Sequence, residues 1–283
     1  MEIKHISVIG GGTMGNGIAH IFALKGFKVD LIEINKELAI KALNTIKNNL
    51  DRQLKKNIIS EDDKTQTLER INTVIGVENT ISDSDLIIEA IIENKESKFS
   101  IFKKLNGIIK SDSIFATNTS SISITELSSS SGRPDRFIGM HFMNPVPIMK
   151  LVEIIRGYDT SDETFNTIKE LTLRLDKVPA EAHDYPGFIS NRILMPMINE
   201  AIFALMEGVA SKEDIDTVMK LGMNHPMGPL TLADFIGLDV CLAILEVLYN
   251  GFNDSKYRPC PLLKKMVAAK KLGRKTGEGF YKY

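Results

Sequence analysis

Short apolar runs rich in β-branched residues alternate with segments of helical periodicity through the first half of the chain. This pattern predicts helices over residues 14–25, 35–54, 95–108 and 162–175, and a shorter one begins after Ser60. The predicted strands cover residues 5–9, 29–32, 72–75, 86–90, 113–117 and 137–141, and residues 151–155 and 177–180 are candidates to extend the sheet. We therefore predict an α/β fold, a Rossmann-type, doubly wound and mostly parallel sheet with helices on both faces.

The pattern changes at Asp184-Tyr185-Pro186-Gly187, beyond which almost no strand signal remains. Pro196 is expected to kink the first helix that follows, and that helix is apolar around most of its circumference, which predicts burial. We expect a first domain over residues 1–184 and a smaller, all-helical C-terminal domain over residues 185–283. Within the second domain the pattern predicts helices over residues 188–207, 214–221, 230–249 and 261–269.

Composition narrows the class of protein further. The 283 residues are 43% hydrophobic and 25% charged, as in a globular domain, and the net charge of -1 argues against nucleic-acid binding. Cys241 and Cys260 make neither a disulfide framework nor a metal site, so we expect no metal and a reducing compartment. No apolar stretch approaches the roughly 18 residues that span a bilayer, and no leader precedes the first strand. These features predict a cytoplasmic protein without a membrane partner.

The most specific local pattern is Gly10-Gly11-Gly12-Thr13-Met14-Gly15, which fits G-x-G-x-x-G between a predicted strand and a predicted helix. The first glycine allows the tight turn, the second lets the backbone approach a pyrophosphate, and the third lets helix and strand pack closely. The helix N-terminus then offers unpaired N–H groups to the anion. The loop predicts a dinucleotide-binding unit.

Glu33 ends the second predicted strand, about twenty residues beyond the loop. A carboxylate at this place accepts hydrogen bonds from the ribose hydroxyls and repels a 2′-phosphate. The nearest cation is Lys36, and no arginine lies nearby to hold that phosphate. The predicted cofactor is NAD rather than NADP, unless Glu33 is only a charge at the end of a strand.

Polar residues at the carboxyl ends of the other strands are candidates for chemistry, because dinucleotide folds bind substrates there. Ser120 follows one strand, His141 ends another, and Glu153 interrupts the apolar run 151–155. A histidine suits proton exchange with an alcohol, since its ordinary pKa of about 6.5 makes both states accessible. A buried glutamate beside it would orient the ring. The alternative is a histidine at the edge of the core and an exposed glutamate on an edge strand.

Seven motifs in order make the chain resemble the L-3-hydroxyacyl-CoA dehydrogenases over its whole length, and most closely the bacterial 3-hydroxybutyryl-CoA dehydrogenases. They are Gly-Gly-Gly-Thr-Met-Gly (10–15), Glu-Ala-Ile-Ile-Glu-Asn (89–94), Asn-Thr-Ser-Ser (118–121), His-Phe-Met-Asn-Pro-Val-Pro (141–147), Pro-Gly-Phe-Ile-Ser-Asn-Arg (186–192), His-Pro-Met-Gly-Pro (225–229) and Lys-Thr-Gly-Glu-Gly-Phe-Tyr (275–281). The resemblance implies NAD-linked, reversible oxidation of a (3S)-3-hydroxyacyl-CoA to the 3-oxoacyl-CoA. It also implies a homodimer formed through the helical domain, with substrate bound in a cleft between the domains.

The resemblance also implies roles for individual residues. His141 becomes the general acid/base and Glu153 its orienting partner, while Ser120 and Asn191 position the substrate. Coenzyme A would meet Lys56, next to Lys55. The implied cofactor contacts outside the glycine loop are Glu33, Glu93, Lys98, Ser120, Asn144 and Lys275.

Two positions depart from the family pattern. Met143 stands where phenylalanine is usual, and Asn49 stands where some relatives place a serine that contacts coenzyme A. Two other functions remain open: a dehydrogenase of a free hydroxy acid such as L-gulonate on the same architecture, and a non-catalytic NAD-binding protein. Oxidation of NADH in the presence of acetoacetyl-CoA separates the three.

Overall fold

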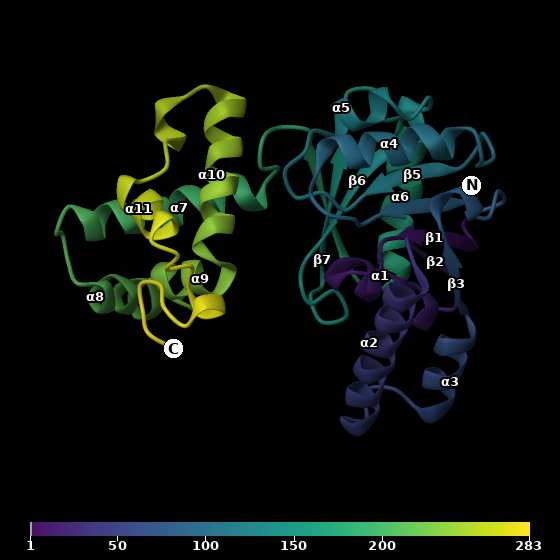
Figure 1. The fold of residues 1–283 in the computed structure, drawn as a ribbon, viewed down its shortest axis with the longest axis horizontal. Coiled ribbons are helices and arrows are strands. Elements are labelled where there is room, and N and C mark those ends of the chain that lie inside the picture. The colour runs from purple at the N-terminus through teal and green to yellow at the C-terminus, as the bar shows by residue number, and fades with distance from the viewer. Residues whose placement is uncertain (1) are drawn as a thin grey trace. The chain divides into compact units, whose positions relative to one another are not determined.

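The computed structural model describes residues 2–283 and divides them into two compact units (Figure 1). The first unit ends at Asp184 and the second spans Tyr185–Tyr283. The division falls where the alternation of strands and helices ends along the sequence.

The first unit is built on one eight-stranded sheet in the order β3-β2-β1-β4-β5-β6-β7-β8. Its neighbours run parallel except β6 and β7, which are antiparallel. The predicted mostly parallel, doubly wound sheet is confirmed, including its two extending strands. The strands are β1 (His5–Ile9), β2 (Lys28–Glu33), β3 (Ile71–Ile75), β4 (Leu86–Glu89), β5 (Ile114–Thr117), β6 (Phe137–Phe142), β7 (Leu151–Arg156) and β8 (Val178–His183).

All described α-helices of the first unit except the first begin at a residue whose side chain caps the helix. Asn35 accepts the backbone N–H of Leu38 at 2.9 Å, and Ser60 forms a capping box with Asp63, so both predicted caps are confirmed. Helices α2 and α3 pack side by side (Figure 1). The helices are α1 (Thr13–Leu24), α2 (Lys36–Lys55), α3 (Glu61–Glu69), α4 (Lys95–Asn106), α5 (Ile124–Ser129) and α6 (Asp162–Arg174).

The strand order reverses at β1, which lies between β2 and β4. The chain leaves β1 toward one side and later returns to its other side. Loops after β1 and β4 therefore diverge, and this opens a crevice at the carboxyl ends of the strands. All residues of β1, β4, β5 and β6 are buried. Phe102 of α4 packs on Phe115 and Phe137 of the sheet, with ring centroids 5.6 and 4.6 Å away. This packing holds α4 against β5 and β6.

The second unit is helical, as predicted. It contains α7 (Ser190–Met206), α8 (Lys212–Thr217), a π-helical turn over Val218–Gly222, α9 (Pro229–Ile236), α10 (Leu238–Phe252) and α11 (Pro261–Ala268). Pro196 lies inside α7. On that helix Met195, Ile198 and Ile202 are buried within the unit, whereas Ile193 is 67% exposed.

The prediction of one helix over residues 230–249 is wrong. Gly237 adopts φ 104° and ends α9 before α10 begins. The apolar pattern continues through the break because both helices bury apolar residues in the same core, among them Leu230, Leu245 and Leu248. The apolar periodicity therefore does not reveal the break between the two helices. The positive φ at this break is a conformation that glycine adopts readily. No described helix of either unit is both long and apolar enough to cross a membrane.

A buried pair, His5 and Asp30, joins β1 and β2 toward their amino-terminal ends. These ends lie opposite the carboxyl ends of the strands, where the crevice opens. His5 Nε2 contacts the Asp30 carboxylate, and Asn72 Nδ2 donates to Asp30 at 2.9 Å. The hydrogen bond to Asp30 raises the pKa of His5 above its usual value. Burial alone would raise the pKa of Asp30, but the hydrogen bonds from His5 and Asn72 outweigh it and lower that pKa.

These directions predict how stability depends on pH. A raised histidine pKa stabilises the folded state below the unfolded pKa of about 6.5, and that contribution is lost as pH rises through the folded value. A lowered aspartate pKa stabilises above about 3.9. We therefore expect His5→Asn to reduce the free energy of unfolding more at pH 5.5 than at pH 8.5, measured by urea unfolding. The exposed His183, replaced in the same way, is the control. An equal loss at both pH values contradicts the assignment.

Candidate active site

The glycine loop follows β1, and its glycines differ in what a side chain at each position would meet. Gly10 has φ 90°, and a Cβ there would lie 2.9 Å from the Ala90 carbonyl oxygen. A Cβ on Gly15 would lie 1.7 Å from the Gly10 carbonyl oxygen. A Cβ on Gly12 would meet nothing within 4 Å. The protein itself requires Gly10 and Gly15, whereas the space beside Gly12 is open to a ligand.

The N-terminus of α1 faces the same space. Its N-cap, Gly12, makes no side-chain hydrogen bond, and its first turn has no acidic residue. Thr13 is exposed and Met14 is half-buried. The first N–H groups of a helix lack intrahelical partners and carry the positive end of its dipole, so they suit a pyrophosphate. The residues present therefore fit the dinucleotide that the motif predicts.

A cavity of about 360 Å³ opens beside the loop. Its walls come from the glycine loop with the start of α1, from the end of β2, from α2, and from the segment after β6. The lining residues are Gly11, Gly12, Thr13, Asn16, Gly17, Glu33, Leu38, Lys41, Thr45, Asn49, Asn144, Pro145, Val146 and Pro147.

Glu33 is held in this wall by two backbone groups. Its Oε1 accepts the N–H of Gly11 at 2.6 Å, and its Oε2 accepts the N–H of Ile34 at 3.1 Å. Gly11 has a role that the motif did not assign, because a Cβ there would lie 2.6 Å from Cβ of Ala42 on α2. In the sequence, the feature that indicates this role of Gly11 is its position inside a run of three consecutive glycines.

His141 and Glu153 are register partners on the antiparallel strands β6 and β7. His141 Nδ1 and Glu153 Oε2 are 2.7 Å apart, and the two side chains are 11% and 2% exposed. A buried carboxylate stabilises the ring orientation in which Nδ1 carries the proton, and Nε2 then points away from the carboxylate. This is the arrangement of a histidine acid/base with its orienting partner.

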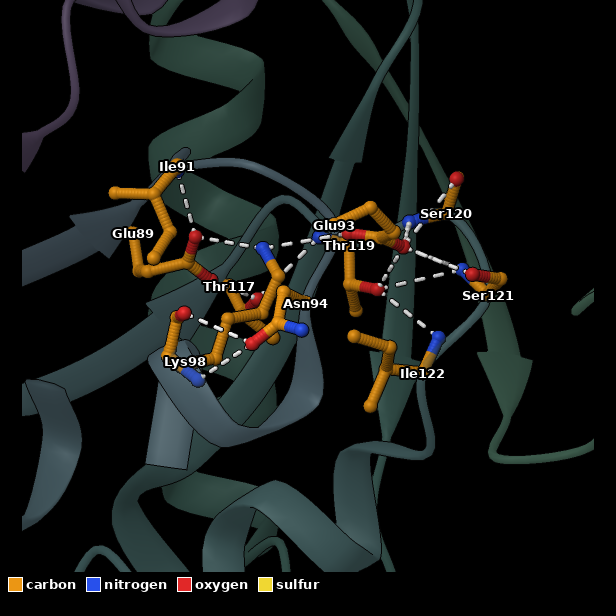
Figure 2. A network of polar contacts seen from close by, with 11 residues as sticks. Glu89, Ile91, Glu93, Asn94, Lys98, Thr117, Thr119, Ser120, Ser121 and Ile122 are labelled. Atoms are coloured by element: carbon orange, nitrogen blue, oxygen red, sulfur yellow. Dashed lines mark hydrogen bonds and ion pairs between the residues drawn. The ribbon is translucent and has the colours of Figure 1, made fainter. Parts of the chain in front are cut away.

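Ser120 lies in the loop that follows β5, and this loop is tied to Glu93 (Figure 2). Glu93 Oε1 accepts the N–H of Ser120 at 2.9 Å, the N–H of Ser121 at 3.1 Å and the Ser121 hydroxyl at 2.9 Å. The Thr119 hydroxyl donates to the same oxygen. Burial would raise the pKa of Glu93, but the Lys98 charge and these hydroxyl groups lower it. Glu93 therefore stays ionised and holds the loop.

Lys98, on α4, is 1% exposed and faces inward. Its Nζ lies 2.6 Å from Glu89 Oε1 and 3.3 Å from Glu93 Oε2. The family resemblance implies that Lys98 is a cofactor contact, and in the structure its ammonium group contacts two carboxylates of the protein.

The remaining predicted site residues are distributed over both units. Asn144 lines the cavity of the first unit, and Lys56 is exposed at the C-terminus of α2. In the second unit Asn191 lies buried in the first turn of α7. Lys275, in the turn Arg274–Thr276, forms an ion pair with Asp239 of α10, its Nζ lying 2.6 Å from Oδ2. Across residues 2–283 no cluster of three acidic, histidine or cysteine side chains has the grouping of a metal site.

Comparison with known proteins identifies the family. Residues 5–185 match the 3-hydroxyacyl-CoA dehydrogenase NAD binding domain, and residues 187–283 match the C-terminal domain of the same family. The chain belongs to the 3-hydroxyacyl-CoA dehydrogenase family. Its first unit is thus an NAD-binding domain.

Relatives match along nearly the whole chain. A probable 3-hydroxybutyryl-CoA dehydrogenase of Deinococcus radiodurans is 55% identical, covering 98% of this chain and 99% of that protein. A 3-hydroxybutyryl-CoA dehydrogenase of Bradyrhizobium diazoefficiens is 54% identical, covering 99% and 96%. The crystal structure of (S)-3-hydroxybutyryl-CoA dehydrogenase from Ralstonia eutropha superimposes with a TM-score of 0.97 at 50% identity, covering 100% and 99%.

Proposed function

We infer that the protein is an NAD-dependent 3-hydroxyacyl-CoA dehydrogenase that acts on 3-hydroxybutyryl-CoA and forms acetoacetyl-CoA reversibly. The observation that carries this function is the contact of 2.7 Å between His141 and the buried Glu153, at the same end of the sheet as the NAD loop. A dinucleotide cradle alone fixes a cofactor class, whereas the histidine and its carboxylate supply the proton transfer that an alcohol needs. The names of the relatives supply the substrate.

Each residue has a defined task in this function. Bound NAD⁺ supplies the acceptor for the hydride that leaves C3 of the substrate. His141 takes the C3 hydroxyl proton on Nε2, and Glu153 stabilises the imidazolium that forms. In the reverse direction His141 returns the proton to the carbonyl oxygen. Ser120 hydrogen-bonds the reacting oxygen, and Asn191 positions the thioester from the helical domain.

The other assignments are part of the same proposal. Glu93, Lys98, Asn144 and Lys275 serve the cofactor, together with the glycine loop and Glu33. Lys56 binds phosphates of coenzyme A, which its exposure at the end of α2 permits. We also propose, from the sequence, that the protein is cytoplasmic.

A single assay tests the function. We expect the purified protein to oxidise NADH in the presence of acetoacetyl-CoA, followed at the NADH absorbance band, and to leave acetoacetate unreacted with NADH and L-gulonate unreacted with NAD⁺. Turnover of the free acid alone would identify a hydroxy-acid dehydrogenase instead. Tight NADH binding without turnover of either compound would indicate a non-catalytic NAD-binding protein.

Glu33 makes the cofactor preference testable. We expect kcat/KM for NADH to exceed that for NADPH by about 100-fold, because a carboxylate repels the 2′-phosphate. Glu33→Ala should reduce the ratio to about tenfold or less, since the repulsion and the ribose hydrogen bonds disappear together. Glu37→Ala, in the first turn of α2, removes an exposed carboxylate nearby and is the matched control. Equal use of both cofactors by the unaltered protein would contradict the role of Glu33.

Exposed apolar side chains of the second unit support the homodimer. Ile193, Val209, Val218, Leu221, Met223 and Phe235 are exposed on it. A dimer interface formed by this unit would remove such apolar side chains from water. Sedimentation velocity of the full chain tests this, and a monomer at all concentrations would rule out the dimer.

A further inference from the structure

We propose that Glu89 is a positioning residue of the reaction, because it fixes Lys98, which fixes Glu93, which in turn holds the Ser120 loop. This inference rests on the proposed function for the meaning of Ser120, and its first test does not depend on activity. The side chains of Glu89, Lys98 and Glu93 form what we call the carboxylate relay (Figure 2).

The relay begins at a buried carboxylate. Glu89 is the last residue of β4 and is 0% exposed. Its Oε1 accepts from Lys98 Nζ at 2.6 Å and from the N–H of Ile91 at 2.7 Å, and its Oε2 accepts from the Thr117 hydroxyl at 2.6 Å. A buried carboxylate is costly unless it is paired and hydrogen-bonded. These contacts stabilise the charge and fix the side chain against β5.

The second step is the lysine between two carboxylates. Lys98 Nζ contacts Glu89 and Glu93 and is almost completely buried. Lys95, one turn earlier on α4, pairs instead with Glu126 at 2.9 Å. An ammonium group carries three donors, so one lysine can join both carboxylates. Glu89 therefore decides where the Lys98 charge sits, and this position decides where the Glu93 carboxylate sits.

The third step divides the two oxygens of Glu93 between two tasks. Oε2 faces Lys98, while Oε1 receives the donors of the loop after β5. The Ser120 hydroxyl itself lies 3.4 Å from Oε1. The loop has both backbone and side-chain donors on one oxygen, so a rotation of Glu93 breaks them together. Buried Glu89 is thus connected to Ser120 through three consecutive contacts.

The charges explain why Glu89 matters beyond packing. Two carboxylates share one ammonium group, and the groups that face Glu93 are Lys98 from α4 and the Thr119, Ser120 and Ser121 donors. Without the Lys98 charge, the pKa of Glu93 would rise, because burial disfavours the charged form and the neighbouring Glu89 carboxylate would repel it. A protonated Glu93 accepts fewer hydrogen bonds and releases the loop.

The first test reads the loop directly in the full-length protein. We expect Glu89→Gln to accelerate amide hydrogen exchange of Ser120 and Ser121 by about tenfold or more, because their N–H groups lose a fixed acceptor. The matched control is Asp85→Asn. Asp85 lies just before β4, at the other end of the strand, and pairs with Lys110 through a contact of 2.5 Å. It should lower stability without changing exchange at Ser120 and Ser121.

The second test reads the reaction. We expect Glu89→Gln to lower kcat with acetoacetyl-CoA by about tenfold while thermal stability falls no more than in Asp85→Asn. Lys98→Met should move the acid limb of the kcat profile to higher pH, and Glu89→Gln/Lys98→Met should move it partly back. If Glu89→Gln does not fold, Glu89→Asp keeps the charge and withdraws the carboxylate from Lys98 by the length of a methylene group.

The outcomes separate the two proposals. Unchanged exchange at Ser120 and Ser121 in Glu89→Gln and in Glu89→Asp would overturn the relay. So would unchanged kcat combined with an acid limb that Lys98→Met leaves in place. Accelerated exchange in a protein that never reduces acetoacetyl-CoA would support the relay and reject the proposed function.

Discussion

His141→Gln is expected to lower kcat with acetoacetyl-CoA by about 10²- to 10⁴-fold, the usual contribution of a positioned acid/base. Glutamine can keep a hydrogen bond to Glu153, but it cannot exchange a proton with the reacting oxygen. His141 lies on β6, outside the glycine loop and outside the cavity wall. NADH affinity should therefore stay within about twofold, measured by fluorescence titration, while steady-state kinetics report kcat.

A matched histidine separates this loss from a general effect. His183 ends β8 and is exposed, and His183→Gln should leave kcat unchanged. Glu153→Gln should also reduce kcat, because it removes the charge that stabilises the imidazolium. Near-normal turnover in His141→Gln would remove His141 from the mechanism.

The second large effect distinguishes two glycines of the same loop. Gly15→Ala should lower the free energy of unfolding by more than about 3 kcal/mol, because its Cβ would overlap a backbone oxygen that cannot move aside. Gly12→Ala should change that free energy by no more than about 1 kcal/mol, since the space around it is open. It should nevertheless raise the Kd for NADH about tenfold or more, because the methyl group occupies the place of the pyrophosphate.

Urea unfolding and NADH titration of both variants test this difference. Gly26→Ala, where φ is 91° and a Cβ meets nothing within 4 Å, measures the cost of backbone strain alone. Unchanged NADH affinity in a folded Gly12→Ala variant would show that the pyrophosphate lies elsewhere.

The sequence predicted most of the first unit because its signals are local. The glycine loop, the Asn35 and Ser60 caps and the buried strands each depend on neighbours within a few residues. The same locality explains the error over residues 230–249. An apolar pattern records which side chains meet a core, and it does not record that Gly237 reverses the sign of φ between two helices.

For the candidate site too, the sequence predicts local positions but not the contacts between strands. The sequence alone placed Ser120 and His141 at strand ends and Glu153 inside an apolar run, because apolar runs and their ends are visible in the sequence. It left open whether His141 meets Glu153, since that contact depends on the register of two antiparallel strands, and a shift by one residue turns every side chain to the other face. The fold supplies that register.

What the sequence by itself determined is the nucleotide loop with its steric demands, the type and order of nearly all elements, and the acidic residue that ends the second strand. Only the tertiary structure decided that Glu153 lies against His141, and that the Lys98 ammonium group faces Glu89 and Glu93 inside the protein. The physical reason is that burial and charge pairing depend on which residues meet across the sheet. The contact of His141 with Glu153 joins positions 12 residues apart. The contacts of Lys98 with Glu89 and Glu93 join positions 9 and 5 residues apart. Glu93 in turn contacts Ser121, which lies 28 residues further along the chain.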